Sequence, residues 1–205
     1  MSLTIILIAI TVLTSWYAWN NPAIQSKWIM NPPKIANGEY LRFLTSGFIH
    51  ANWQHLIFNM FTFYFAGTNL ENIFTQIFGE TGKIYFVLLY LAAIVASDLP
   101  SYFSHKNDSN YNTLGDSGGV SAVLFSLVLF APTSTILIYF IPMPFIVFAV
   151  LYVFYSLYMV RAGTDNVNHS AHLWGAAFGI VCCIILYPAA IEIFTNDLRN
   201  WKIFN

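Results

Sequence analysis

Charged residues are scarce in this chain of 205 residues. Eight lysines and arginines and nine acidic residues make up only 8% of it, against about 25% in an ordinary soluble domain. The formal net charge is −1, and the few cationic residues form no basic patch. These shortages exclude a water-soluble enzyme, a disordered chain and a nucleic-acid-binding protein.

Cysteine is almost missing as well. The two cysteines, Cys182 and Cys183, are neighbours inside an apolar run. Adjacent cysteines cannot join distant segments, and they are not spaced as metal ligands, so they indicate no redox compartment. The sequence also has no internal repeat, and an inverted-repeat transporter therefore gains no support.

What is present is strongly apolar. Hydrophobic residues make up 58% of the chain, and the mean hydropathy is +0.63. We therefore expect an all-α, polytopic membrane protein in which residues 1–205 form a single domain with six transmembrane helices. The apolar runs lie at about residues 3–19, 53–70, 84–103, the two halves of 117–160, and 166–191. The first run lacks the basic start and small-residue cleavage site of a signal peptide, which favours a retained helix.

The run at residues 117–160 needs a break. As one helix it would be about 66 Å long, twice the hydrocarbon core of a bilayer, which is about 30 Å thick. Pro132, Pro142 and Pro144 predict the turn, because proline has no N–H group to donate within a helix. The aromatic-rich loop at residues 20–50 is expected to lie partly in the membrane interface.

Polar residues gather at the starts of three predicted helices. The second, fourth and sixth helices run in the same direction, so their first turns share one side of the membrane. Polar groups inside spans are costly and suggest function. The residues concerned are His50, His55 and Asn59 in the second helix, Ser117 in the fourth, and His169 and His172 in the sixth.

This combination suggests nucleophilic catalysis. A serine at matching depth with a histidine can attack a carbonyl carbon while the histidine takes its proton. Ser117 lies at a helix start, where free N–H groups favour an oxyanion. His55 and Asn59 are four residues apart, so both can donate from one helix face. Of the two candidate bases, His172 precedes the small-residue face of Gly175 and Gly179, whereas His169 is expected to be a solvated loop-end residue.

Other interpretations of these residues stay open at this point. The four histidines could bind a metal ion, although no HExxH motif occurs. Asp116 is expected to be a solvated acid at the end of the polar loop. Arg42 and Glu71 are expected at membrane interfaces or as anchors of the first loop.

Taken in order, the motifs resemble the rhomboid intramembrane serine proteases. The resemblance covers about 140 residues. It rests on residues 39–50, the His/Asn motif at residues 50–60, Gly67, Glu71 and Gly79, the tetrapeptide Gly115-Asp116-Ser117-Gly118, and Ala171-His172-Leu173-Trp174-Gly175 with Gly179.

The resemblance implies a six-helix rhomboid-like fold and a Ser-His dyad without a third acid. Ser117 would be the nucleophile and His172 the base, with His55, Asn59 and the Ser117 N–H stabilising the oxyanion. The protein would need no cofactor or metal. It would cleave transmembrane protein substrates that enter from the lipid, near the extracytoplasmic face of a bacterial cell (inner) membrane, with its N-terminus in the cytoplasm.

The chain departs from the family pattern at two places. Family members often have an aromatic residue four positions after the serine that packs on the catalytic histidine, and here that position is Ser121. The glycine often found seven or eight positions after the serine is replaced by Leu124 and Phe125. The alternatives are a non-proteolytic membrane binding protein with the same fold and a histidine-lined metal transporter or channel.

Overall fold

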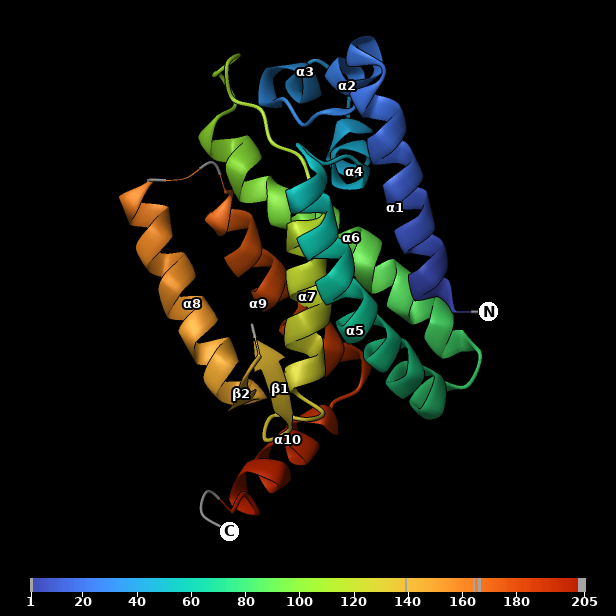
Figure 1. Cartoon of the computed structure of the whole chain (residues 1–205), viewed down its shortest axis with the longest axis vertical. Helices are drawn as coiled ribbons and strands as arrows, with labels where there is room; N and C mark the ends of the chain where they lie inside the picture. Colours follow the sequence, from blue (N-terminus) through green and yellow to red (C-terminus); the bar gives the residue numbers. More distant parts are fainter. Residues whose placement is uncertain (1, 139, 164, 166, 203–205) are drawn as a thin grey trace.

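A computed structural model describes residues 2–138, 140–163, 165 and 167–202, and these residues are mainly helical (Figure 1). The predicted start of the last apolar run, residue 166, lies outside them. Each predicted apolar run overlaps one main helix. These helices are α1 (Leu3–Trp19), α5 (Trp53–Phe78), α6 (Thr81–Ser104), α7 (Ser117–Val128), α8 (Phe145–Ala162) and α9 (His169–Leu186).

Three of these helices, α6, α8 and α9, are long and apolar enough to cross a membrane. Helices α1 and α7 are apolar but shorter, and α5 is long but carries several polar residues. With a rise of 1.5 Å per residue, the 12 residues of α7 extend only about 18 Å. Helix α7 is therefore shorter than the hydrocarbon core, which is about 30 Å thick, and the count of six spans stays a prediction.

The predicted break between the fourth and fifth helices is confirmed. It is a hairpin in which β1 (Thr135–Ile138) pairs antiparallel with β2 (Ile141–Pro144), with Thr135 opposite Pro144 and Ile138 opposite Ile141. After α9 the chain forms α10 (Ala190–Arg199). Helix α10 is joined to the segment before the hairpin, because the Asp197 carboxylate accepts hydrogen bonds from the N–H and hydroxyl of Thr133.

The first loop consists of short helices at one end of the bundle (Figure 1). They are α2 (Pro22–Trp28), α3 (Pro32–Ala36), α4 (Arg42–Thr45) and the 3₁₀ turn η1 (Ser46–Phe48). The buried Arg42 donates to the carbonyl oxygens of Ser26 and Ile29 and pairs with Glu39. Arg42 therefore anchors this loop, as expected from the sequence.

Glu71 has a structural role at the start of α1. Its buried carboxylate on α5 accepts hydrogen bonds from the hydroxyls of Ser2 and Thr4 and from the N–H groups of Leu3 and Thr4, at 2.7 to 3.0 Å. Free N–H groups at a helix start favour a negative charge. Glu71 therefore fixes the start of α1 against α5 rather than anchoring the first loop.

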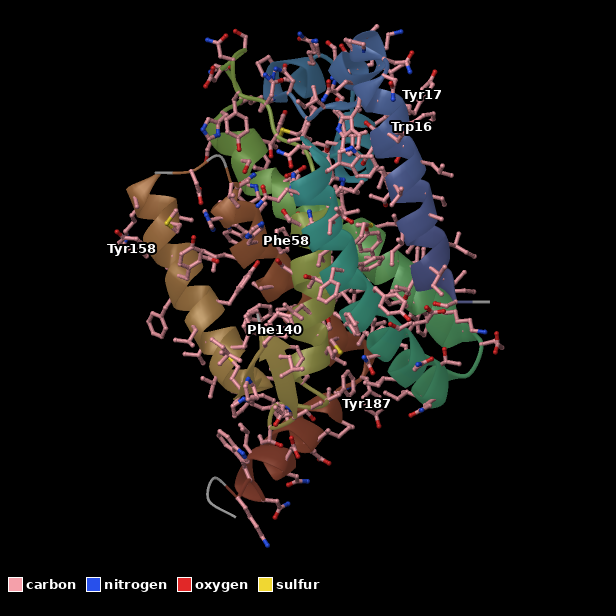
Figure 2. All side chains as sticks on the ribbon, in the orientation of Figure 1. Trp16, Tyr17, Phe58, Phe140, Tyr158 and Tyr187 are labelled. Carbon is pink, nitrogen blue, oxygen red and sulfur yellow. The ribbon has the colours of Figure 1, made fainter. Side chains whose placement is uncertain are left out.

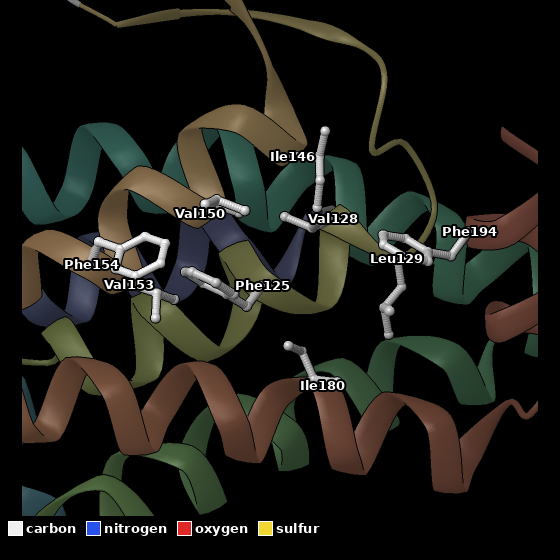
Figure 3. A pocket seen from close by; sticks show the side chains of 10 residues that line it. Phe125, Val128, Leu129, Ile146, Val150, Val153, Phe154, Ile180 and Phe194 are labelled. Carbon is white, nitrogen blue, oxygen red and sulfur yellow. The ribbon is translucent and has the colours of Figure 1, made fainter. Parts of the chain in front are cut away.

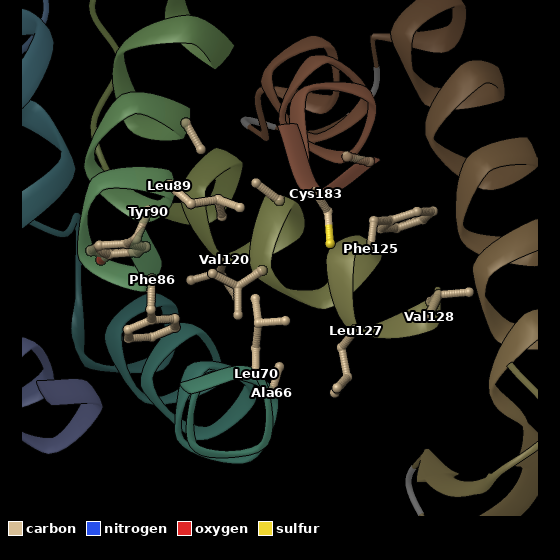
Figure 4. Packing of buried hydrophobic residues seen from close by; sticks show 14 of the residues in the cluster. Ala66, Leu70, Phe86, Leu89, Tyr90, Val120, Phe125, Leu127, Val128 and Cys183 are labelled. Carbon is tan, nitrogen blue, oxygen red and sulfur yellow. The ribbon is translucent and has the colours of Figure 1, made fainter. Parts of the chain in front are cut away.

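Helix α7 lies at the centre of the bundle, between α5, α6, α8 and α9 (Figure 1). Side chains of α5, α6, α7 and α9 form its buried apolar core, including Leu70, Phe86, Tyr90, Val120 and Cys183 (Figure 4). Large apolar side chains also cover the outside, among them Trp16, Tyr17, Phe140 and Tyr158 (Figure 2). Such a surface suits contact with lipid.

Candidate active site

Ser117 is the first residue of α7, and the loop before it makes a sharp bend. Gly115 has a φ of +108°, which L side chains rarely adopt, and a Cβ there would lie 2.6 Å from the imidazole of His55. Glycine therefore permits both the bend and the close approach of His55. Within the part of the chain that the structure describes, the hydroxyl and N–H of Ser117 and the N–H of Gly118 donate to no other group.

Helices α7 and α9 pack through the predicted glycine face. A Cβ on Gly175 would clash with the backbone oxygen of Gly118, and one on Gly179 would clash with that of Ala122. The Ser126 hydroxyl also donates to the Gly179 oxygen at 2.9 Å. Gly118 follows Ser117 directly, and His172 lies less than one turn before Gly175. This contact therefore brings Ser117 and His172 to the same depth.

The His172 ring contacts two other rings. Tyr152 of α8 stacks on it with ring centroids 6.0 Å apart and planes 24° apart, and His169 meets it edge-on at 5.5 Å. Among the described residues, no side chain forms a hydrogen bond with the His172 imidazole, so its nitrogens stay available. Tyr152 of α8 therefore makes the aromatic contact with His172 that Ser121 cannot make.

The replacement of the family's glycine by Leu124 and Phe125 does not separate α7 from α9. Phe125 faces α8, where it lines an apolar cavity of about 270 Å³ together with Val150, Val153 and Phe154 (Figure 3). Because the glycine contacts of Gly175 and Gly179 lie on a different face of α7, the bulk at position 125 leaves them intact.

His169 is not the solvated residue expected from the sequence. Its side chain is 6% exposed, and its Nε2 lies 3.1 Å from Asp165 Oδ2. This hydrogen bond is the main reason that the pKa of the Asp165 carboxyl is below its ordinary value. The prediction failed because His169 contacts the Tyr155 ring of α8 and the Asp165 carboxylate, which the local sequence does not indicate. His169 also lines a polar cavity of about 450 Å³ with Ser101, His105 and Asn168.

The sequence prediction is also wrong for Asp116. Its side chain is fully buried rather than solvated: Oδ1 lies 3.0 Å from His50 Nε2, and Oδ2 accepts from the Tyr90 hydroxyl. The Ser15 hydroxyl lies 3.1 Å from His50 Nδ1, so both ring nitrogens of His50 have partners. The polar loop therefore enters the protein before α7, and Asp116 fixes the position of the Ser117 backbone.

His55 and Asn59 lie beside the start of α7. The His55 ring contacts Gly115 and meets the His50 ring edge-on at 4.8 Å. The Asn59 amide nitrogen, Nδ2, lies 3.1 Å from His50 Nε2. An amide nitrogen carries two hydrogens. Among the described residues Nδ2 has no other hydrogen-bond partner, so its second hydrogen is free to donate elsewhere.

Four of the histidines lie in two pairs. Ring contacts pair His50 with His55 and His169 with His172, and both nitrogens of His50 have partners. Among the residues that the structure describes, no three His, Cys, Asp or Glu side chains lie together as ligands would.

Three residues of this region could not be found by sequence reasoning. Ser15 and Tyr90 hold the Asp116–His50 pair, and Tyr152 contacts His172. Each stands in an apolar run of the kind that supplies packing residues, so nothing local marks it. Only the neighbouring helices give these side chains a role.

Comparisons with known proteins agree on one family. A family model described as "Rhomboid domain" matches residues 37–189. "RHOMBOID-like protein 12, mitochondrial" of Arabidopsis thaliana is 26% identical over 83% of this chain and 53% of that protein. "Putative rhomboid protease YdcA" of Bacillus subtilis is 28% identical over 72% of this chain and 67% of that protein. "Presenilin-associated rhomboid-like protein, mitochondrial" of Homo sapiens is 30% identical over 80% of this chain and 39% of that protein. The chain thus spans about half the length of the Arabidopsis relative and less of the human one.

Proposed function

Since this chain belongs to the rhomboid family, we propose that it is an intramembrane serine endopeptidase that cleaves transmembrane proteins with a Ser117–His172 dyad. The observation that carries the proposal is the close contact of Gly175 with Gly118. It supports a common depth for Ser117 and His172, which lie next to these glycines on α7 and α9. The free hydroxyl of Ser117 and the unbonded ring of His172 suit a nucleophile and its base.

In the proposed reaction, Ser117 Oγ attacks the scissile carbonyl carbon while His172 takes the hydroxyl proton. The tetrahedral oxyanion accepts hydrogen bonds from the Ser117 N–H and from the side chains of His55 and Asn59. His172 then protonates the leaving amine, and water hydrolyses the acyl-enzyme with His172 again acting as base. Each step uses groups of this chain and water, so the proposal requires no cofactor or metal.

The protein is a membrane protein, and the described part of the chain has three helices long and apolar enough to span a bilayer. Two of the three relatives described above are mitochondrial by name, so they do not support the expected bacterial inner membrane. We propose that cleavage takes place near the membrane surface at which the first turns of α5, α7 and α9 lie. The substrate would reach this site from the surrounding lipid.

The proposal is tested with the purified protein in lipid vesicles. We expect a fluorophosphonate to label the chain once, with the adduct on Ser117 in a peptide map, and to stop cleavage of a co-reconstituted transmembrane substrate. A metal chelator should leave cleavage unchanged. A folded protein that neither reacts nor cleaves would indicate a non-proteolytic binding protein, and loss of activity with the chelator would indicate a metal site.

The oxyanion assignment leads to a separate prediction. Asn59→Ala should lower kcat by about 10²–10³-fold, the loss seen when one such donor is removed, with little change in KM, because the donor acts mainly in the transition state. The check is steady-state kinetics in vesicles, with Asn69→Ala as the control, since Asn69 is an exposed residue of the same helix. An unchanged kcat in both Asn59→Ala and His55→Ala would contradict the assignment.

A further inference from the structure

We propose that Tyr152 of α8 is a positioning residue that orients the His172 imidazole for proton transfer at Ser117. The inference rests on the proposed function, because it concerns the same reaction. Tyr152 is not near the other polar residues in the sequence, and no motif includes it. Its role follows from the contacts that it makes with α7 and α9.

The Tyr152 side chain connects the two helices that carry the dyad. Its ring stacks on His172 of α9, and its hydroxyl lies 2.8 Å from the hydroxyl of Ser121 on α7. Ser121 lies one helical turn after Ser117. The hydrogen bond therefore ties the Tyr152 ring to the nucleophile's own helix, and the ring face is held against the base.

Two further rings limit the movement of Tyr152. Phe125 of α7 lies 5.5 Å from it and Phe148 of α8 lies 5.7 Å from it, measured between ring centroids. A tyrosine held at its hydroxyl and packed on several sides has little freedom to rotate. It therefore presents a fixed face to His172.

His172 depends on such a contact for its orientation. No carboxylate or other described side chain forms a hydrogen bond with its imidazole, so packing must set the plane of the ring. The ring contacts are the stacked Tyr152 and the steeply inclined His169. Proton transfer requires a near-attack geometry, and small misplacements of a reacting group lower the rate strongly.

Kinetics of variants in lipid vesicles test the inference. Tyr152→Leu removes both the ring face and the hydroxyl, and we expect kcat to fall by about 10–100-fold, the loss typical of supporting partners, with KM within about twofold. Tyr152→Phe keeps the ring, so we expect a loss of only about threefold. Tyr158→Leu, on an exposed part of the same helix, should match the wild type.

The hydroxyl contact has its own test, which remains available if Tyr152→Leu does not fold. Ser121→Ala should lower kcat as much as Tyr152→Phe, and the double variant should be no worse than either single one, because all three lose the same hydrogen bond. Losses that multiply in the double variant, or a wild-type kcat in all three, would overturn the inference.

The outcomes also separate this inference from the proposed function. Failure of the wild type to cleave the substrate or form the Ser117 adduct would remove the proposed function itself. An active wild type with an equally active, folded Tyr152→Leu variant would overturn only the positioning role. A raised KM with unchanged kcat would overturn it too, since it would make Tyr152 a substrate contact.

Discussion

Replacing His172 by Ala is expected to abolish both substrate cleavage and fluorophosphonate labelling, as Ser117→Ala should. Without His172, the proposed acceptor of the Ser117 hydroxyl proton is missing, and a serine hydroxyl at neutral pH is a weak nucleophile. Dyad members act as a unit, so we expect either variant to lose at least about 10⁴-fold in kcat. The measurement is turnover of a transmembrane substrate in vesicles, with labelling intensity as the second readout.

His169→Ala is the matched control for His172→Ala. His169 lies three residues earlier on α9, its Nε2 is hydrogen-bonded to Asp165, and its ring contacts that of His172 at a steep angle. We expect this variant to keep at least about a tenth of both activities. A dead His169→Ala with an active His172→Ala would show that the base lies one turn nearer the loop than the glycine contact implies.

Gly175→Ala is expected to destabilise the protein and disable the site together. Helix propensity alone predicts a gain of about 1 kcal/mol for replacing a mid-helix glycine by alanine. The added Cβ, however, would clash with the backbone oxygen of Gly118, and backbone cannot rotate away as a side chain can. We therefore expect the opposite sign, a loss of about 2–3 kcal/mol from overpacking, with α7 and α9 pushed apart.

Thermal unfolding in detergent and labelling at Ser117 measure the two effects of this change. The separation of the helices should lower the labelling rate by more than about tenfold, because it moves His172 away from Ser117. Ala177→Val adds bulk to an exposed position of the same helix and should change neither quantity much. A more stable Gly175→Ala with normal labelling would mean that helix propensity outweighs packing at this position.

Much of the architecture follows from local patterns. The shortage of charge and the long apolar runs predict a helical membrane protein, since the bilayer requires every backbone polar group to be bonded within the spanning element. Prolines predict the break before α8, because they cannot continue a helical ladder. The spacing of Gly175 and Gly179 predicts a face for close packing beside His172, and the structure identifies α7 as the helix packed against it.

The surroundings of the site depend on which helices become neighbours. Asp116 and His169 both have the local sequence of solvated loop-end residues, yet both are buried. Asp116 contacts His50, which is distant in the sequence, and His169 contacts Asp165 in the loop before α9. Burial of a charged or polar group is costly unless it is paired, and the partner, such as His50 for Asp116, is set by packing rather than by spacing.

Tyr152 is the clearest example of a residue whose role is set by packing and not by local sequence. Periodicity places it on an apolar helix, where an aromatic side chain indicates only packing or contact with lipid. Its stacking on His172 and its bond to Ser121 exist because α8 lies against α7 and α9 at one rotation and one depth. The residue types at Ser117 and His172 thus indicate the chemistry, whereas the supports of the base arise from contacts between helices, which no local pattern encodes.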